Sequence, residues 1–318
     1  MNTTTQSPCI VLSWSSDTAH TRQPTLYICI IATIIHTIFW IHFLFYSSVR
    51  QRGMFWLYIY LLTDLFLIFR FFLFYGQRIS NVCVPRSART ILCYFEAISK
   101  IYTNVIQSYI LLGLNICRYI QIVFNRNIYI KNIRSLILGN LAIYIIPMLN
   151  IVIQFLINWT QLWRQLGGIC DIKYISIYVQ IFNMFIVYFI PVCSNIIFIY
   201  LCIRFISSTG NIRNQQIINN RRKFHLRLVI QSIVFYSVWL ILWSPFVLSF
   251  QFINANTPIG IVTSMLNYIQ IAIDPAIVAI IDIRFYKAWK KTFTKIIRKR
   301  KRSRQTLPTI ITEDIKRR

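Results

Sequence analysis

Acidic residues are the scarcest chemical class in this sequence. Only 8 Asp and Glu stand against 34 Lys and Arg in 318 residues, which gives a formal net charge of +26. Charged residues of both signs make up just 13% of the chain, well below the ~25% of a typical soluble domain. A soluble globular protein is expected to carry more surface charge than this, so the composition favours a membrane protein.

The motifs of common enzymes are also missing. The sequence contains no HExxH, no GxSxG and no phosphate-binding glycine loop. Its eight cysteines form no CxxC pair and no Cys/His cluster with metal-ligand spacing. We therefore expect neither an enzyme nor a resident cofactor, apart from the ion considered below. Residues 1–24 are polar and show no cleavable signal peptide, so the first membrane span is expected to act as its own insertion signal.

Long apolar runs are what the sequence has in abundance. Hydrophobic residues make up 56% of the chain, and runs of about 20 residues, enough to cross a ~30 Å hydrocarbon layer, recur along it. Seven spans are predicted, at residues 26–49, 54–75, 93–119, 135–157, 175–205, 224–252 and 259–282. The sequence thus predicts an all-α fold, a seven-transmembrane helix bundle over residues 26–282. A tail (1–25) precedes it, and an amphipathic eighth helix (283–298) and a basic tail (299–318) follow.

Lysine and arginine crowd into alternate connections between these spans. The connections assigned to the cytoplasm hold nine of them, and the segment from Arg284 onward holds 14. With Arg118, Arg204 and Arg227 at the cytoplasmic ends of their spans the total is 26, against six in the segments assigned to the outside. The positive-inside rule then predicts a multi-pass membrane protein with an extracellular N-terminus. We expect it to lie in the plasma membrane. Topology and anionic lipid account for the basic charge, so no nucleic-acid partner is expected. Glycosylation sequons at Asn2 and Asn158 both fall outside in this arrangement.

The third span, residues 93–119, carries a regular series of polar residues. Glu96, Lys100, Asn104 and Gln107 are separated by steps of four, four and three, which places them on one face of a helix. An unpaired polar group facing lipid costs several kcal/mol. This helix is therefore expected to stand inside the bundle.

With the spans placed, the chain resembles the rhodopsin-like (class A) G-protein-coupled receptors. Its marked residues occur in the family's order and on the corresponding helices, across residues 26–297. The matching residues are Asp64, Cys93, Arg118–Tyr119, Cys170, Pro191, Trp243–Ser244–Pro245, Asp274–Pro275 and Phe285.

The sequence also departs from the family pattern. His36 replaces the first-helix asparagine, Val278 replaces the tyrosine after Pro275, and the fourth-helix tryptophan is missing. The acid that usually precedes Arg118 is Cys117, and an acid often found low on the sixth helix is His225. Because neither of these can pair with the arginine as an acid would, we expect high ligand-free activity. The seventh span contains no lysine, which excludes a retinal Schiff base and hence an opsin.

The resemblance implies a receptor that binds an extracellular ligand between the outer halves of its helices and activates a heterotrimeric G protein. It also implies a disulfide between Cys93 and Cys170. It assigns coupling and activation to Arg118, Tyr119, Trp243, Pro245, Asp274 and Pro275, and ligand contacts to Glu96, Lys100, Asn104, Trp243 and Tyr268.

The charge of the ligand is predicted from Lys100. Family members that bind small amines place an aspartate at this level of the third helix, so Lys100 reverses the charge. The expected ligand is acidic, neutral or a peptide that offers a carboxylate. In the alternative interpretation, Glu96 pairs with Lys100 four residues later and leaves a neutral pocket.

Two further pairings are left open by the sequence. In the family a sodium ion lies near the equivalents of Asp64 and Asp274. Two carboxylates suit a cation or share a proton, and His36 could supply the counter-charge instead. Cys9 and Cys83 both fall outside and could form a second disulfide, but spacing alone does not fix the connectivity.

Three other functional classes compete with this interpretation. A bitter-taste-like chemosensory receptor is compatible with the short connections. A seven-helix channel or transporter would show internal repeats or broken helices at the bilayer centre, and the sequence shows neither. A membrane-embedded enzyme would need a metal cluster or a nucleophile–base set.

Overall fold

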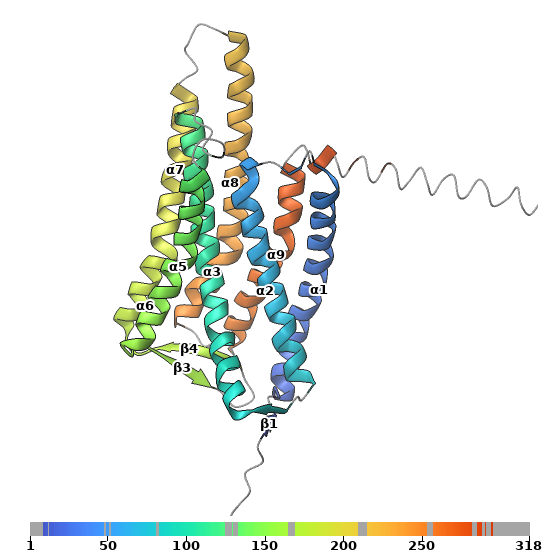
Figure 1. Cartoon of the computed structure of the whole chain (residues 1–318), viewed down its shortest axis with the longest axis vertical. Helices are drawn as coiled ribbons and strands as arrows, with labels where there is room; N and C mark the ends of the chain where they lie inside the picture. The colour runs from blue at the N-terminus through green and yellow to red at the C-terminus, as the bar shows by residue number, and fades with distance from the viewer. Residues whose placement is uncertain are drawn as a thin grey trace, which may run out of the picture.

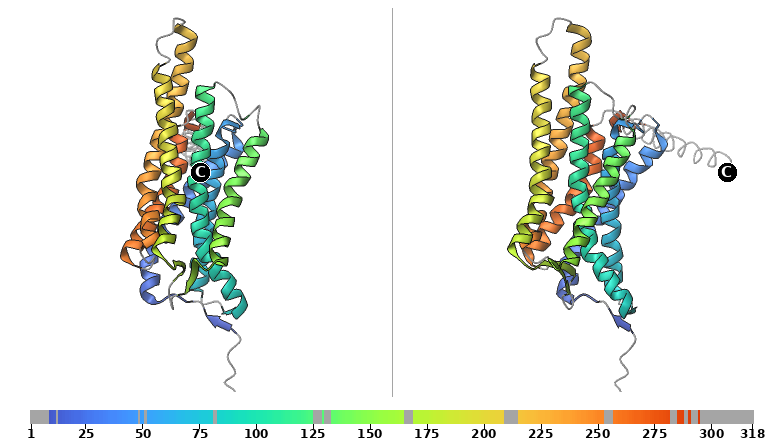
Figure 2. Two further views of the ribbon diagram at one scale, coloured as in Figure 1. Left: turned by 90° about the vertical axis from the view of Figure 1, so that its left-hand side faces the viewer. Right: turned by 60° about the vertical axis from the view of Figure 1, so that its left-hand side comes forward.

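The computed structural model describes residues 9–11, 13–47, 49–50, 52–80, 83–124, 129, 133–164, 169–208, 215–252, 257–281, 285–287, 290 and 294. Long helices run side by side along one axis, with two small sheets at one end (Figure 1). We call the end with the sheets the hairpin end and the opposite end, where α3 finishes, the Arg118 end. Helices α7 and α8 extend beyond the others at the Arg118 end (Figures 1 and 2).

Seven helices of the described residues are long and apolar enough to cross a membrane, which confirms the seven-span bundle. The helices are α1 (Ser16–Phe45), α2 (Phe55–Ile79), α3 (Arg86–Val123), α5 (Ile133–Leu156), α6 (Ile177–Met184) continued by the π-helical turn η2 (Phe185–Phe189) and α7 (Ile190–Ser208), α8 (Gln215–Phe252) and α9 (Pro258–Ile281). A 3₁₀ turn, η1 (Arg52–Met54), precedes α2.

A short eighth helix follows the bundle. Residues 285–287, 290 and 294 are helical, and the Thr294 hydroxyl donates to the carbonyl of Lys290 at 2.7 Å, a contact typical of one helical turn. Phe285 is fully buried and stacks on Phe39 of α1, with ring centroids 4.6 Å apart. This contact holds the start of the helix against the bundle.

Several helices are longer than hydropathy predicted. Helix α1 begins at Ser16 rather than near residue 26, and the hydroxyl of Ser15 caps it by accepting from the N–H of Thr18 at 3.2 Å. Helix α2 continues to Ile79 and therefore contains Arg78, which the sequence assigned to a loop. Hydropathy detects only the apolar part of a helix, whereas capping and buried partners let its polar turns continue. Arg22, assigned to the N-terminal tail, lies in α1 for the same reason.

Helix α3 occupies the middle of the bundle. It contacts α2, α5, α7 and α8. Helix α1 packs mainly on α9, and α9 packs on both α1 and α8. Most of the surface of α3 is buried, whereas α1 and α5 leave rows of isoleucine and leucine exposed. Such continuous apolar faces are stable against lipid rather than water. The protein is a multi-pass membrane protein.

Two antiparallel ribbons close the hairpin end. Strand β1 (Cys9–Val11) pairs with β2 (Cys83–Pro85), and β3 (Thr160–Arg164) pairs with β4 (Cys170–Tyr174). A disulfide joins Cys93 on α3 to Cys170 on β4, as the resemblance implied. Cys83 is also disulfide-bonded, while the side chain of Cys9 lies outside the described residues.

Candidate functional site

The four polar residues predicted on one face of α3 are all buried. Glu96, Lys100, Asn104 and Gln107 are each at most 7% exposed. They follow one another from the hairpin end toward the bilayer centre, and each faces a different set of partners. The candidate site is therefore a buried polar column along α3.

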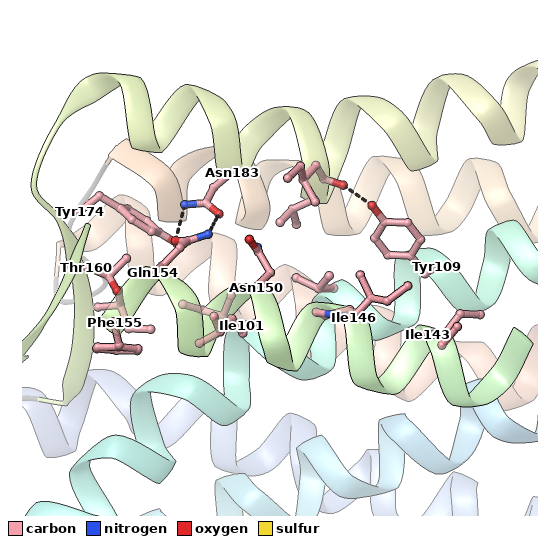
Figure 3. Close-up of a pocket in the computed structure, with 17 residues that line it drawn as sticks. Ile101, Tyr109, Ile143, Ile146, Asn150, Gln154, Phe155, Thr160, Tyr174 and Asn183 are labelled. Atoms are coloured by element: carbon pink, nitrogen blue, oxygen red, sulfur yellow. Dashed lines mark hydrogen bonds between the residues drawn. The ribbon is translucent and has the colours of Figure 1, made fainter. Parts of the chain in front are cut away.

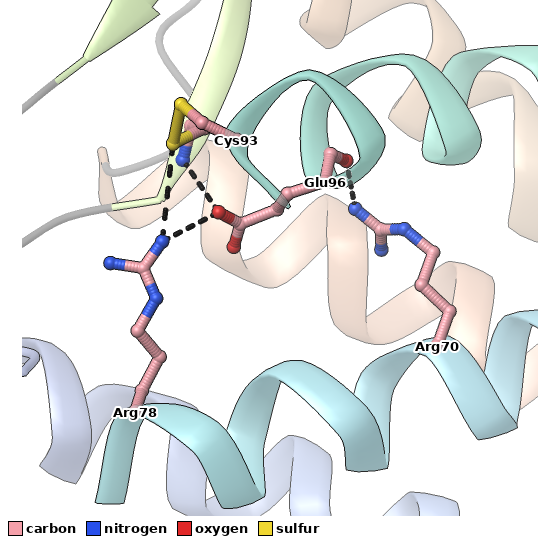
Figure 4. A network of polar contacts seen from close by, with 5 residues as sticks. Arg70, Arg78, Cys93 and Glu96 are labelled. Carbon is pink, nitrogen blue, oxygen red and sulfur yellow. Dashed lines mark hydrogen bonds and ion pairs between the residues drawn. A yellow bond between two sulfur atoms is a disulfide. The ribbon is translucent and has the colours of Figure 1, made fainter. Parts of the chain in front are cut away.

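Glu96 is held by an arginine of the neighbouring helix. Its Oε2 accepts from a terminal guanidinium nitrogen of Arg78 at 2.6 Å and from the backbone N–H of Cys170 at 3.1 Å (Figure 4). Glu96 is thus ion-paired with Arg78, and its pairing with Lys100 stays a prediction. Sequence analysis missed this ion pair because hydropathy ended the second span at residue 75 and so placed Arg78 in a loop.

Arg70 approaches the same turn of α3 from one level deeper in α2. Its Nε donates to the hydroxyl of Ser99 at 2.6 Å, and a terminal nitrogen donates to the carbonyl oxygen of Glu96 (Figure 4). The guanidinium also lies 5.4 Å from the ring centroid of Phe74. The direction of this side chain, which the sequence left uncertain, is therefore toward α3.

Lys100 lies one turn below Glu96. Its ammonium nitrogen is 4.4 Å from the ring centroid of Phe246 on α8, a cation–π contact. Asp171, the residue after the disulfide cysteine, is close enough for Lys100 to influence it: burial raises the pKa of the Asp171 carboxyl, and Lys100 acts in the opposite direction. The disulfide thus brings a carboxyl group into the outer part of the column.

Positive charge exceeds negative charge in this outer part. Four cationic side chains are buried there, against the two carboxyl groups of Glu96 and Asp171. The cations are Arg22 from α1, Arg70 and Arg78 from α2, and Lys100 from α3. We call these six residues the charged cluster. Sequence reasoning missed Arg22, Arg78 and Asp171, although Asp171 could have been found from its position beside Cys170.

A cavity of about 40 Å³ opens onto the charged cluster at the hairpin end. Arg22, Arg70 and Lys100 contribute to its wall, together with Glu96 and Tyr268. Tyr268 comes from α9, and its ring lies edge-on to Phe71 at 5.2 Å between centroids. The structure therefore brings together three residues predicted as ligand contacts: Glu96, Lys100 and Tyr268.

Asn104 links the charged cluster to α8. Its side-chain amide donates to the carbonyl oxygen of Lys100 at 2.7 Å, and its Oδ1 accepts from the indole Nε1 of Trp243 at 3.0 Å. Trp243 stacks on Trp239, with centroids 4.2 Å apart. Pro245, two residues further along α8, lies inside the helix. Two hydrogen bonds of Asn104 thus connect the backbone carbonyl of Lys100 to the indole of Trp243 on α8.

Two aspartates lie deeper in the bundle, and both are fully buried. Asp64 accepts from the side-chain amide of Gln107 at 2.6 Å. Asp274, followed by Pro275 inside α9, accepts from Tyr60 at 3.0 Å and from Gln270 at 2.7 Å.

One carboxylate oxygen of each aspartate, Asp64 Oδ2 and Asp274 Oδ1, has no hydrogen-bond partner among the described residues. Oxygen atoms of this kind are suitable ligands for a hard cation, so these residues fit a sodium ion. His36 instead faces the carbonyl oxygen of Ile271 at 3.1 Å, and within the described part of the chain it forms no hydrogen bond to either aspartate.

Arg118 ties α3 to α8 near the opposite end. One guanidinium nitrogen donates to the hydroxyl of Ser232 and to the carbonyl oxygen of Leu228 at 3.1 Å. Both of these acceptors are neutral, unlike the acids of the family pattern, and the expectation of high ligand-free activity stays a prediction. Tyr119 points elsewhere, with its ring 5.5 Å from that of Phe198 on α7.

The remaining predicted residues lie apart from this column. Asn158 is exposed, with φ of 57°, at the turn before β3. Asn2 lies outside the described residues, as do the side chains of His225 and of residues 221–223.

Comparisons with known proteins identify the fold. No protein-family model matches the chain, and no curated protein matches it. Among solved structures 575 chains match, and one of them is the crystal structure of squid rhodopsin. That structure superposes with a TM-score of 0.68 at 16% sequence identity, over 90% of this chain and 83% of the other. The chain therefore has the seven-helix fold of the rhodopsin-like G-protein-coupled receptors.

Proposed function

We propose that this protein is a cell-surface receptor that binds an anionic extracellular ligand and activates a heterotrimeric G protein. In this proposal the hairpin end is extracellular and the Arg118 end is cytoplasmic, as the distribution of lysine and arginine favours. The sequons at Asn2 and Asn158 then face the side on which glycans are added. The exposure of Asn158 supports this assignment.

The observation that carries the proposal is the charge of the cluster at the hairpin end. Four buried cationic side chains share this region with two carboxyl groups. Ionisable groups at membrane depth are costly, and they usually mark a functional site. An anion in the adjoining cavity would bring the local charge closer to neutral. A simple amine would instead add a cation to a region that already has an excess of them.

The contacts of Asn104 suggest how the ligand acts. A ligand that draws Lys100 toward the cavity would disturb the carbonyl oxygen that Asn104 contacts, and with it the hydrogen bond to Trp243. Trp243 and Ser232 lie on the same helix, α8, and Ser232 holds Arg118 at the other end. Ligand binding would then favour a second packing of α8 in which Arg118 is free to meet the G protein. This is a population shift driven by differential affinity.

A sodium ion between Asp64 and Asp274 is a further part of the proposal. The two carboxylate oxygens without partners would hold it, and its charge would offset theirs. Helix α9 contains no lysine, so a covalently bound retinal is not part of the proposed function.

The test is a panel of carboxylates, peptides and amines, applied to cells that express the protein, with G-protein activation as the readout. The same panel is applied to Lys100→Ala and to Lys173→Ala. Lys173 is an exposed lysine of β4 whose ammonium lies 4.6 Å from the ring of Trp163, so it serves as a matched control. We expect an acidic agonist whose potency falls about 10- to 100-fold in Lys100→Ala, the range for a hydrogen bond to a charged group. Potent activation by a simple amine, unaffected by Lys100→Ala, would contradict the proposal.

A further inference from the structure

A second cavity lies on the lipid-facing side of the bundle. It has a volume of about 270 Å³ and is enclosed by α3, by α5, by α6 with η2, and by the β3–β4 ribbon (Figure 3). This is far above the ~15 Å³ that admits one water and close to the lower limit of ~300 Å³ for small-molecule pockets. It shares no lining residue with the cavity beside the charged cluster.

The wall of this cavity carries no charged side chain among the residues that line it. Its apolar part comes mainly from isoleucine and valine, and Ile146 at its edge is 64% exposed on the face that meets lipid. The polar side chains are Tyr109, Asn150, Gln154, Thr160, Tyr174 and Asn183. A ligand here would meet apolar surface over most of its length and neutral hydrogen-bonding groups at a few points.

Four of the polar side chains, those of Gln154, Thr160, Tyr174 and Asn183, lie toward the hairpin end, whereas Tyr109 lies at the other end of the cavity (Figure 3). Gln154 and Asn183 face each other across the gap between α5 and α6 (Figure 3). Their amides exchange two hydrogen bonds, of 2.7 and 3.0 Å. Thr160 lies at the same end and is 4% exposed, yet its hydroxyl has no hydrogen-bond partner among the described residues. A buried hydroxyl without a partner costs ~1–3 kcal/mol, so a ligand that supplies one would be favoured at this point.

The helix formed by α6, η2 and α7 lies along one wall of the cavity and contains the π-helical turn η2. In a π-helical turn the carbonyl of Ile186 would pair with the N–H of residue 191, but Pro191 has none. The hydroxyl of Tyr109 on α3 donates to this carbonyl instead, at 2.8 Å (Figure 3). Turns of this kind occur frequently at functional sites. Here the turn lies directly beside the cavity.

We propose that this cavity binds a neutral single-chain lipid of the monoacylglycerol class, which enters from the bilayer between α5 and α6. The acyl chain lies along the isoleucine and valine side chains. The glycerol hydroxyls meet Thr160 and the amide pair of Gln154 and Asn183. The absence of charged groups in the wall disfavours fatty-acid anions and lysophospholipids, and the volume disfavours lipids with two chains.

The test uses the full-length protein in lipid nanodiscs that contain a monoacylglycerol with a photoreactive group on its acyl chain. After irradiation, labelled peptides are identified by mass spectrometry, and unlabelled monoacylglycerol is added as competitor. We expect saturable labelling of α5, α6 or η2 that the competitor suppresses, and much weaker labelling by a photoreactive fatty acid. Labelling confined to other helices, or equal labelling by the fatty acid, would overturn the proposal.

Substitutions at Thr160 and Asn158 distinguish the effect of the Thr160 hydroxyl from the effect of a glycan on Asn158. Thr160→Val keeps the shape but removes both the hydroxyl and the sequon, whereas Asn158→Gln removes only the sequon and Thr160→Ser keeps both. We expect the apparent affinity of the probe to fall about five- to tenfold in Thr160→Val alone. Equal affinity in Thr160→Val and Asn158→Gln would refute the role of the hydroxyl.

A cavity-filling change gives a second test that does not depend on the hydroxyl. Ala142 on α5 lines the cavity, and Ala142→Phe would occupy its volume without removing a hydrogen bond. We expect this variant to lose specific labelling and to unfold at a higher temperature, because a filled cavity regains packing contacts. Undiminished labelling in the folded variant would contradict the proposal.

Discussion

Replacing Ser232 by alanine tests whether a neutral hydrogen bond holds the closed packing of the bundle. Arg118 donates to the Ser232 hydroxyl and to the Leu228 carbonyl, both on α8. A hydrogen bond to a charged group contributes ~1.5–3 kcal/mol. Because the Leu228 carbonyl remains in Ser232→Ala, the lower value applies, and ~1.4 kcal/mol corresponds to a tenfold change in an equilibrium constant. A ligand-free open population of about 1% would rise to roughly 10%.

Two measurements report this shift independently. Ligand-free G-protein activation at matched surface expression measures the functional consequence, and the separation of α8 from the rest of the bundle measures the packing. For the second, spin labels are attached at Leu226 on α8 and Arg134 on α5, both exposed, with the exposed Cys193 replaced by serine. We expect a longer-distance population to appear in Ser232→Ala.

The matched control is Ser237→Ala, which removes a hydroxyl from an exposed position of the same helix. It should leave both the distance distribution and the ligand-free activity unchanged. If Ser232→Ala and Ser237→Ala give the same distances and activity as the parent, the contact between Arg118 and Ser232 does not hold α8 in place.

Two further predictions concern α3. Arg118→Ala should leave surface expression largely intact but strongly weaken G-protein activation, because it removes the cation that is proposed to meet the transducer. Signalling equal to the parent at equal expression would show that the proposed role is wrong. Gly113→Ala should lower the unfolding temperature relative to Gly76→Ala. A Cβ atom at Gly113 would lie 3.2–3.3 Å from three ring atoms of Trp56, whereas a Cβ atom at Gly76 would have no atom within 4 Å. Overpacking costs ~1–3 kcal/mol, which exceeds the ~1 kcal/mol by which alanine is favoured over glycine in a helix. Equal unfolding temperatures for the two variants would contradict the close packing of Gly113 on Trp56.

Hydropathy and charge were sufficient to predict the bundle. Apolar runs of the length of a bilayer produce helices because every backbone polar group must be satisfied within its own segment. Spacing along α3 likewise predicted that Glu96, Lys100, Asn104 and Gln107 share a buried face. These are local properties, which a single helix expresses whatever its neighbours are.

The partners of those residues depended on packing between helices. Arg78 lies 18 residues before Glu96 in the sequence, and the two meet only because α2 continues past its apolar part and lies against α3. Ser232 and Arg118 are separated by 114 residues, and no local pattern marks that serine among the others of α8.

The cavity beside α5 is the feature least accessible from sequence. Its polar groups come from α3, α5, α6, β3 and β4, segments that meet only through the fold. The sequence by itself determined the number of membrane-spanning helices, the polar face of α3 and the expected orientation in the membrane. These follow from the thickness of the bilayer, the period of the helix and the distribution of lysine and arginine. Tertiary structure alone decided which charges pair, which acceptors hold Arg118 and where a volume is left unfilled, because these depend on how side chains from distant segments meet.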